Sequence, residues 1–392
     1  MKVLLLGGGM IAHDQILPSL YQLQRLGLVS SIDVCARRAA TLGSLAENKK
    51  ILAAFPDVPP FKPRTEPFAD VIAAMEPRQL VIVGLPDQLH FDAVMTALRH
   101  DQNVLCVKPL VLTVRESEII EREARSRGLM VAVEYHKRFD DRSHMARQRY
   151  RAGLFGDFKL GTACLFEKWY YRHSNFQNWF TTDATDAFTY IGCHYVDLVH
   201  FITGLVPAAI SLYGVRDRFP NGNEGWLWTD ARVIWSNGAV LNVQNALGFP
   251  DAAPGSNTQG ITMYCSKGDA GAWLEHNDRY RGLSYAYVRK PEGDGATQYA
   301  EPSPDYFTYV DHGGPGLVPT GYGYRSIAYT LDRARELESG NRSLDQRREL
   351  LKAWDDAGIL ATPANSRFNE AIIEAARVSI QNDGATVKIA QP

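Results

Sequence analysis

Short apolar runs alternate with helical stretches over the first 138 residues. Five of these runs have the length and continuous hydrophobicity of strands that are buried on both faces. They are Lys2–Leu6, Ser31–Cys35, Leu80–Gly84, Asn103–Val107 and Leu129–Glu134. Thr113 and Glu116 have the spacing of a helix capping box, which predicts a helix that ends near Arg127. Because strands alternate with helices, we predict a doubly wound parallel sheet over residues 1–138.

The pattern changes after Arg138. A helix is expected over Arg142–Arg151 and a strand over Phe158–Phe166, and a long aromatic and polar stretch follows. From Ala208 to Val288 the chain is rich in β-forming residues, and Asn237-Gly238 is a hairpin signal between two of the strands. Later segments are expected to be a loop at Pro302–Gly323 and helices at Ser326–Ser339 and Ser366–Gln381. We predict a second, α+β domain over residues 139–392, with an open-faced, mostly antiparallel sheet and C-terminal helices that can pack back on the first domain.

Composition narrows the class of protein. A chain of 392 residues predicts two domains, or three, at roughly 150 residues each. The 42 basic and 44 acidic side chains give a net charge of -2, which does not favour nucleic acid or an anionic membrane as a partner. The 5 cysteines are scattered without a C-x-x-C pair, so neither a disulfide framework nor a metal cluster is expected. The apolar start is too short for a signal peptide, and no run reaches the roughly 18 apolar residues of a membrane span. We expect a cytoplasmic protein.

A glycine-rich turn follows the first strand. Gly7, Gly9, Met10, Ile11 and Ala12 form the pattern G-x-G-x-x-A between that strand and a helical stretch. The first glycine permits a tight turn, the second lets a pyrophosphate approach the backbone, and the small third residue packs helix on strand. The helix start then offers N–H groups to the phosphate. We interpret the first domain as a Rossmann dinucleotide-binding domain.

The second strand bears on the choice of cofactor. An NAD-specific domain usually ends this strand with an acidic residue for the ribose 2′-hydroxyl. Here Asp33 lies in mid-strand, and Arg37 and Arg38 stand where the acid is expected. Guanidinium groups suit a 2′-phosphate, which favours NADP. The alternative is that both arginines are the solvated start of a helix and that the cofactor is NAD.

Four segments form an ordered series: Leu85-Pro86-Asp87-Gln88-Leu89-His90, Lys108-Pro109, Glu134-Tyr135-His136-Lys137-Arg138-Phe139 and Gly192-Cys193-His194-Tyr195-Val196-Asp197. In order and spacing the series resembles the Gfo/Idh/MocA family of sugar oxidoreductases. The resemblance implies that Lys108 reaches the reacting centre and the cofactor ribose, with Leu85, Pro86, His90 and Pro109 beside the cofactor. It also implies that His194 is the catalytic histidine. Homodimers or homotetramers, paired through the exposed face of the second sheet, are implied as well.

The chain departs from the family pattern at several positions. Val107 replaces the glutamate before the lysine, Tyr190 replaces the aspartate four residues before His194, and the family's Trp-Arg pair is Trp179-Phe180. Tyr190 could serve as an acid or base if a nearby lysine lowers its pKa. It could equally be a core aromatic at the entrance of the helix that carries His194.

Other residues are candidates for substrate binding. Aromatic faces suit sugar C–H surfaces, and charged or amide groups suit hydroxyls and anionic substituents. The candidates are Tyr135, His136, Arg138, Lys168, Trp169, Arg172, Trp179 and Asp197. In the alternative reading the aromatics of residues 168–179 pack under the loop and the cations face water. Residues 312–316 and 321–324 are expected to form a second wall of the site.

Three functional hypotheses remain open. The resemblance implies an NAD(P)-dependent oxidoreductase that transfers a hydride between nicotinamide and a hydroxyl or carbonyl carbon of a sugar, glycoside or cyclitol. In this hypothesis Lys108 polarises the substrate oxygen, and His194, with Tyr190, takes or returns the proton of that oxygen. The first alternative is a redox-neutral glycoside hydrolase or lyase that oxidises the sugar transiently, which the changes at Val107 and Tyr190 leave open. The second is a catalytically inactive nucleotide-binding protein.

Overall fold

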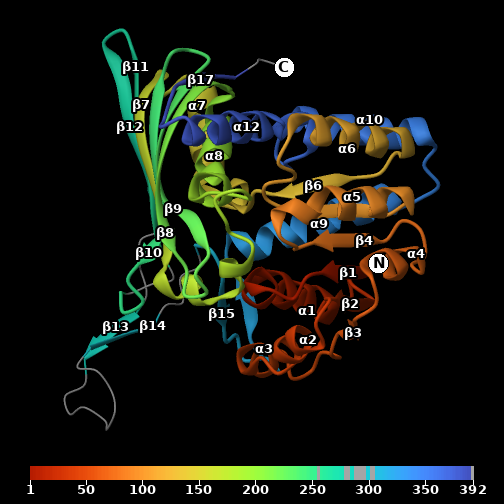
Figure 1. Ribbon diagram of the computed structural model, residues 1–392. Coiled ribbons are helices and arrows are strands. Elements are labelled where there is room, and N and C mark those ends of the chain that lie inside the picture. The colour runs from red at the N-terminus through yellow and green to blue at the C-terminus, as the bar shows by residue number, and fades with distance from the viewer. Residues whose placement is uncertain (254–256, 278–282, 287–296, 301–304, 390–392) are drawn as a thin grey trace.

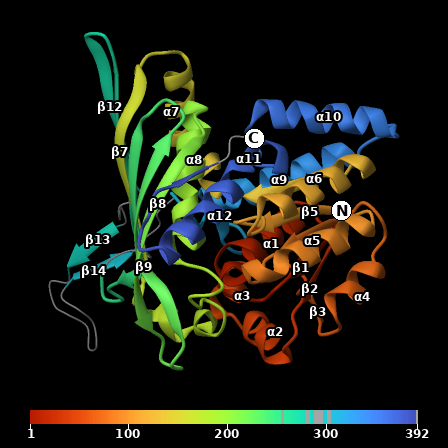
Figure 2. The same cartoon turned by 45° about the horizontal axis from the view of Figure 1, so that its top comes forward.

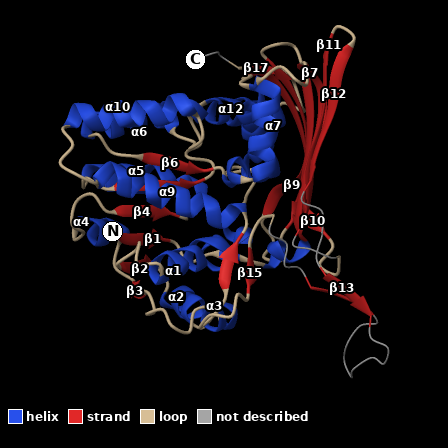
Figure 3. Cartoon of the chain, turned by 180° about the vertical axis from the view of Figure 1, so that it is seen from behind, coloured by secondary structure: helices blue, strands red, loops and turns tan. Residues whose placement is uncertain are grey.

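The computed structural model describes residues 1–253, 257–277, 283–286, 297–300 and 305–389. Two sheets stand side by side, and helices fill the space between them and cover both faces of the first sheet (Figures 1 and 3). Two predicted segments, 208–288 and 302–323, fall partly outside the described residues. The parts concerned are 254–256, 278–282, 287–288 and 302–304. No helix in the described part of the chain is long and apolar enough to cross a membrane.

The first sheet is fully parallel, with strand order β3-β2-β1-β4-β5-β6. Its strands are β1 (Lys2–Leu6), β2 (Ser31–Cys35), β3 (Lys62–Arg64), β4 (Leu80–Val83), β5 (Asn103–Val107) and β6 (Val131–Glu134). All four residues of β4 are buried, as expected for a central strand covered by helices on both faces. The predicted Rossmann sheet is confirmed. The edge strand β3 was not predicted, because it has three residues, one of them proline, and two are exposed.

Helices connect these strands and cover the sheet. They are η1 (Ala12–Ile16), α1 (Leu17–Arg25), α2 (Ala39–Ala46), α3 (Lys49–Ala54), α4 (Phe68–Ala73), η2 (Asp87–Leu89), α5 (His90–Arg99) and α6 (Val114–Arg127). The predicted cap of α6 is present, since the Thr113 side chain accepts a hydrogen bond from the Glu116 N–H. Gly128 ends the helix in the left-handed conformation, with φ 62°.

The second sheet has the order β12-β11-β7-β10-β9-β8-β17, and only the β7–β10 pair is parallel. Its strands are β7 (Asp157–Lys168), β8 (Pro207–Arg218), β9 (Glu224–Trp235), β10 (Val240–Phe249), β11 (Asn257–Lys267), β12 (Ala270–Asn277) and β17 (Val387–Lys388). The predicted hairpin joins β9 to β10, with Gly238 at φ 83°. Two short pairs, β13 (Leu283–Ala286) with β14 (Thr297–Ala300) and β15 (Thr308–Val310) with β16 (Val318–Thr320), complete the strands of the described residues.

The two faces of the second sheet differ. Alternate residues such as Ala163, Leu165 and Ile261 are buried in a core with α8 (Cys193–Thr203) and α12 (Phe368–Gln381). The outer face carries exposed aromatic side chains, among them Tyr264 and Trp273, whose rings stack 5.5 Å apart. The predicted open-faced, mostly antiparallel sheet is confirmed. The short helices on its inner side and in the aromatic stretch are η3 (His136–Phe139), α7 (Asp141–Arg151), η4 (Trp169–His173), η5 (Asn175–Asn178) and η6 (Phe188–Gly192).

After the second sheet the chain returns to the first. The helix α9 (Tyr322–Glu338) buries Leu331, Ala334 and Leu337 in the same core as Val3 and Leu5 of β1. The helices α10 (Leu344–Ala357) and α11 (Pro363–Ser366) follow along α6, and α12 lies between the two sheets (Figure 2). The sequence did not predict α10. Gly321, with φ 104°, turns the chain into α9 where a side chain would meet the Tyr306 backbone.

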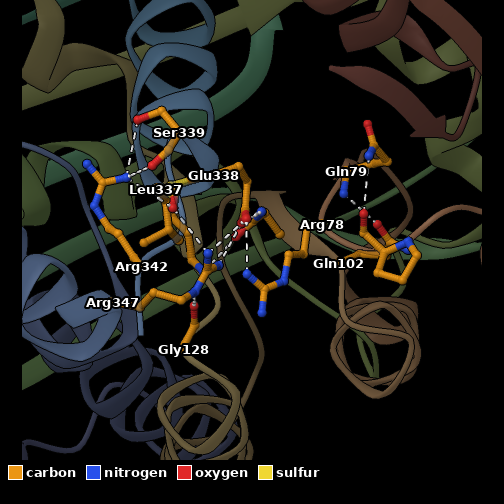
Figure 4. Close-up of polar contacts among 12 residues, drawn as sticks. Arg78, Gln79, Gln102, Gly128, Leu337, Glu338, Ser339, Arg342 and Arg347 are labelled. Atoms are coloured by element: carbon orange, nitrogen blue, oxygen red, sulfur yellow. Dashed lines mark hydrogen bonds and ion pairs between the residues drawn. The ribbon is translucent and has the colours of Figure 1, made fainter. Parts of the chain in front are cut away.

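A buried ion pair fixes the far end of α9. Arg347 of α10 is 2% exposed and donates to Glu338 Oε1 at 2.6 Å and Oε2 at 2.8 Å. Its Nε donates to the Gly128 carbonyl at 2.7 Å, and Asn103 at the start of β5 donates to Glu338 at 2.7 Å. Figure 4 shows Arg347 between Gly128 and Glu338. They tie α9 and α10 to the amino-terminal edge of the first sheet.

Candidate active site

The glycine-rich turn has the shape that a pyrophosphate needs. Gly7 has φ 102°, and a Cβ there would lie 2.1 Å from the Gly84 carbonyl oxygen, so only glycine fits. A Cβ on Gly9 would meet no atom within 4 Å, which leaves this side of the turn open. Ala12, 1% exposed, packs on the sheet, and its N–H donates to the Gly9 carbonyl at 3.0 Å as the helix begins. These residues fit a dinucleotide phosphate approaching the backbone.

The helix after this turn begins irregularly. Met10 and Ile11 are partly buried, and η1 is a single π-helical turn before α1. Met10 packs against the aromatic cluster of Phe176 and Phe180, so the aromatic stretch of the second domain contacts the phosphate turn. π-Helical turns within helices are frequent at functional sites.

The end of β2 presents two exposed guanidinium groups. Arg37 and Arg38 are both exposed at the carboxyl end of the strand, and Arg38 Nη2 donates to Asn175 Oδ1 at 3.1 Å. Asp33 is in mid-strand, where its Oδ2 accepts from Arg64 Nε at 2.9 Å. Asp33 is therefore paired with Arg64 within the sheet. The exposed charged side chains directly after the strand end are those of Arg37 and Arg38.

Lys108 stands at the carboxyl end of β5. The Lys108–Pro109 peptide bond is cis. His90 braces this edge, because its Nδ1 lies 2.8 Å from the Pro109 carbonyl and its Nε2 lies 2.8 Å from the Leu85 carbonyl. Lys108 Nζ donates to the Tyr190 carbonyl oxygen and lies 4.0 Å from the centroid of the Tyr190 ring. The lysine of the first domain thus meets the turn η6 of the second, while Pro86 is partly buried beside Leu85.

His194 lies in the first turn of α8, directly after η6. The side chain is 5% exposed, and its buried Nδ1 has no hydrogen-bond partner. Burial, and then the charges of His136, Lys108 and Lys137, lower the pKa of His194 well below its ordinary value. His194 is therefore neutral at neutral pH and can accept a proton. The structure brings Lys108 next to Tyr190 and within electrostatic range of His194.

The prediction that a lysine lowers the pKa of Tyr190 is wrong. Burial raises the pKa of the phenol well above its ordinary value, and nearby acidic groups such as Glu167 add to the effect. Lys108 contacts the ring face and the backbone carbonyl of Tyr190. The ring packs edge-on against Phe176, Trp179 and Phe180. Its surroundings are those of an aromatic core residue at the site's edge.

Two residues beside His136, namely Glu134 and Lys137, were not assigned to the site by the sequence analysis. His136 was expected there, and its ring lies 4.5 Å from the His194 ring. Its Nδ1 lies 2.9 Å from Glu134 Oε2. Lys137 is 2% exposed and donates from Nζ to Gln259 Oε1 on β11 at 2.5 Å. Glu134 and Lys137 flank His136 within the motif, and that adjacency was the signal that could have found them.

Glu167 is a further missed residue. It continues the inner-face alternation of Ala163 and Leu165 along β7. Burial raises its pKa to about 7, an effect that Lys108 and a hydrogen bond from Asn257 reduce. The alternation along β7 could have placed this carboxyl on the face of the site.

The structure places four of the predicted substrate residues in buried contacts within the protein. Tyr135 is 1% exposed in the core, edge-on to the His194 ring at 6.2 Å. Arg138 and Asp197, each 1% exposed, form a bidentate ion pair at 2.6 and 2.7 Å, so Asp197 does not face the site as predicted. Lys168 donates to the backbone carbonyls of Pro250, Asp251 and Ala253. A buried, bidentate partner uses the guanidinium donors of Arg138 that a substrate would need.

The cationic side chains of residues 168–179 make contacts within the protein. Arg172 is 3% exposed, pairs with Asp217 at 2.5 Å and lies 3.8 Å from the ring centroid of Trp169. Trp179 packs in the aromatic cluster with Phe176. Of the aromatics in this stretch, Phe176 and Trp179 pack under the loop as one alternative expected, whereas the expectation that Lys168 and Arg172 face water is wrong, since they are 5% and 3% exposed. Of the expected second wall, Tyr322 stacks on His136 at 5.4 Å, whereas Gly316 lies against α3 and Arg25.

Comparison with known proteins agrees with this architecture. Residues 1–135 match the Gfo/Idh/MocA oxidoreductase family with its NAD-binding Rossmann fold. This N-terminal region is similar to that family. D-glucoside 3-dehydrogenase of Escherichia coli is 27% identical to this chain over 164 residues, which is 42% of each protein. The chain matches less than half the length of such curated relatives.

Solved structures are similar over the whole chain. Myo-inositol 2-dehydrogenase from Lactobacillus plantarum has a TM-score of 0.64 at 17% identity and covers 100% of this chain and 99% of that one. Levoglucosan dehydrogenase, in complex with NADH and levoglucosan, has a TM-score of 0.65 at 16% identity and covers 100% of both chains. At these identities the similarity shows the shared fold, a Rossmann domain followed by an open-sheet domain.

Proposed function

We propose that this protein is an NAD(P)-dependent oxidoreductase that acts on a hydroxyl or carbonyl carbon of a sugar, glycoside or cyclitol. One observation carries the proposal: Lys108 from the first domain and neutral His194 from the second meet at the carboxyl edge of a Rossmann sheet with an open glycine turn. Ligands of open α/β sheets bind at this edge. The family match of residues 1–135 and the E. coli glucoside dehydrogenase support the reaction class.

Each residue of the site would have a separate role in the proposed hydride transfer. A bound nicotinamide dinucleotide would supply the hydride acceptor or donor. In the oxidation direction, His194 accepts the proton of the substrate hydroxyl, because burial keeps its imidazole neutral. The Lys108 ammonium would stabilise the negative charge that develops on the same oxygen. The neutral amide of Gln259 and the Glu167 carboxyl, on the inner face of the second sheet, suit the remaining hydroxyls.

We further propose NADP(H) as the preferred cofactor. Gly7, Gly9 and Ala12 would hold the pyrophosphate, and exposed Arg37 and Arg38 would face the 2′-phosphate. The pairing of Asp33 with Arg64 supports this choice, since it engages the acidic side chain of β2 in mid-strand. Binding of NAD+ and NADP+ to the wild type and to Arg37→Ala/Arg38→Ala tests it. The variant should lose about tenfold or more in NADP+ affinity, with NAD+ affinity unchanged.

The reaction is tested by incubating the purified protein with sugars, cyclitols and aryl glycosides and both cofactors. Reduced-nicotinamide absorbance and aglycone release are followed in the same wells. Growth of the nicotinamide signal in proportion to substrate consumed supports the proposal. Aglycone release without net reduction would instead establish the redox-neutral hydrolysis, and cofactor binding without any turnover would leave a nucleotide-binding protein.

A further inference from the structure

The segment of η4 and η5, residues 169–178, belongs to the second domain but contacts the first domain at two places. Phe176 lies in a hydrophobic cluster against which Met10 of the glycine-rich turn packs. Asn175 Oδ1 accepts a hydrogen bond from Arg38 Nη2 at 3.1 Å, although the two residues are 137 positions apart in the chain. In a Rossmann domain the glycine-rich turn holds the pyrophosphate, and the end of the second strand faces the 2′ position of the ribose. The segment therefore reaches both places where the cofactor would bind.

Contacts within the second domain hold Asn175 in place. Asn178 Nδ2 donates to the same Oδ1 atom at 3.0 Å. The Gln177 carbonyl accepts hydrogen bonds of 2.8 Å from Asn221 and of 2.8 Å from Asn223, which lie in the turn between β8 and β9. The position of Asn175 is therefore set by its own domain, and Arg38 of the other domain docks against it.

The two arginines at the end of β2 differ in their contacts. Both side chains are exposed. Among the residues that the structure describes, Arg38 donates to Asn175, whereas Arg37 has no hydrogen-bond or ion-pair partner. The contact with Asn175 uses one of the five guanidinium N–H groups of Arg38, so the others can donate to an anion. A partner that already orients a long side chain also reduces the rotamer entropy that is lost when a ligand binds.

We propose that Asn175 is a positioning residue for the cofactor: it holds the Arg38 guanidinium at the end of β2, where a 2′-phosphate would bind, and so favours NADP(H) over NAD(H). The inference rests on the proposed function, since it takes NADP(H) as the cofactor. A neutral amide suits this role. Its oxygen orients the guanidinium without neutralising the positive charge, whereas a carboxylate at this position would pair with Arg38 and repel the phosphate. The second domain thus takes part in selecting the cofactor that the first domain binds.

The test is the binding of NADP+ and NAD+ to the full chain without substrate, measured by isothermal titration calorimetry. In Asn175→Ala the Kd for NADP+ should rise about fivefold, which corresponds to one net hydrogen bond, and the Kd for NAD+ should stay within about twofold. Asn175→Asp should raise the Kd for NADP+ further, by about twentyfold, because it adds a negative charge beside the phosphate. Asn175 is exposed, so neither variant removes a side chain from the core.

Two arginine backgrounds provide the matched control. In Arg38→Ala, the further change Asn175→Ala should leave the NADP+ affinity unaltered, since Asn175 acts through Arg38. In Arg37→Ala, the same change should still weaken NADP+ binding about fivefold, because the contact between Asn175 and Arg38 is intact in that background. An equal loss in both backgrounds, or a parallel loss of NAD+ affinity, would overturn the proposal.

Shorter probes locate the effect within the cofactor. The nucleotides 2′-phospho-AMP and AMP lack the nicotinamide and differ only in the 2′-phosphate. Asn175→Ala should therefore weaken the binding of 2′-phospho-AMP and leave the binding of AMP unchanged. The same response of both nucleotides would overturn the positioning role.

Failure of this inference and failure of the proposed function are distinguishable. If the wild type binds NAD+ as tightly as NADP+, the proposed cofactor and the role of Asn175 both fail. If the preference for NADP+ is lost in Arg38→Ala but kept in Asn175→Asp, the cofactor proposal stands and the role of Asn175 is overturned. Absence of sugar turnover would leave these outcomes unchanged, because all of them are binding measurements.

Discussion

The two ends of α9 lie beside carboxylates with different surroundings, partly buried Glu338 at one end and buried Glu134 at the other. At its carboxyl end, Glu338 receives two hydrogen bonds from Arg347 and one from Asn103 (Figure 4). At its amino end, Ser326 donates to Glu134, whose other partners are the neutral Gln15 and the titratable His136. A guanidinium is always charged, so the first carboxylate has a fixed counterion. The second is held by two neutral donors and an imidazole.

The difference follows from the direction of the strands. Glu338 lies at the amino edge of the parallel sheet, next to the start of β5, and Glu134 is the last residue of β6 at the carboxyl edge. Ligands bind at the carboxyl edge, where strand ends and helix starts leave polar groups free for a partner. One helix thus joins an end that stabilises the fold to an end that can exchange protons.

Lys108→Met is expected to have the largest effect, and it acts at the carboxyl edge only. The variant keeps the apolar stem but removes the charge that stabilises the substrate oxygen, so kcat/KM should fall by about a thousandfold. The melting temperature should change little. Lys352→Met is the matched control, since this exposed lysine pairs only with Asp356 on α10 at 2.6 Å and should leave turnover unchanged. A Lys108→Met enzyme within tenfold of the wild type would remove the assigned role of the lysine.

Arg347→Met tests the opposite end. It removes two hydrogen bonds to the partly buried Glu338 carboxylate and leaves Arg78, 3.7 Å away, as an ion-pair partner, which should cost about 2–3 kcal/mol of stability. The free energy of unfolding in urea at pH 7 measures this loss. Arg347→Met/Glu338→Leu should recover most of it, because removing both charges is far less costly than removing one. In both variants kcat should stay near the wild-type value below the unfolding range, and a large loss of kcat would contradict the separation of the two ends.

Glu134→Gln should lower stability in a pH-dependent way. Weakening hydrogen bonds to a charged acceptor costs roughly 2 kcal/mol at pH 7. The pKa of Glu134 is lower in the folded than in the unfolded protein, so its contribution is fully present above the unfolded-state pKa. It is lost as the pH falls through the folded-state pKa. Unfolding free energies of the two proteins should therefore converge as the pH falls below about 4. A difference that stays constant from pH 7 to pH 3 would contradict an ionised Glu134.

Local patterns in the sequence predicted much of the fold and part of the site. The strands of the first sheet, the turn at Gly7 and Gly9, and the meeting of Lys108 with His194 all depend on order and short spacing. The partners of buried charges depend on contacts between distant segments. Arg138 and Asp197 are 59 residues apart, and Lys168 binds carbonyls more than 80 residues away. No local pattern tells a cation that faces a ligand from one that a distant carboxylate or carbonyl neutralises.

Tyr190→Phe should have the smallest effect, and it separates the phenol from the ring. The variant keeps the ring face that Lys108 contacts and the carbonyl that accepts from Nζ, and it loses only a hydroxyl whose pKa is raised. We expect kcat/KM within about threefold of the wild type, well under the 10²–10⁴-fold of a general acid or base. Tyr190→Leu is the comparison variant, since it removes the ring as well and should loosen Lys108. A hundredfold loss of kcat/KM in Tyr190→Phe would show that the phenol transfers the proton. The carboxyl edge would then hold two proton-exchanging groups, Tyr190 and His194, whereas the structure supports His194 alone.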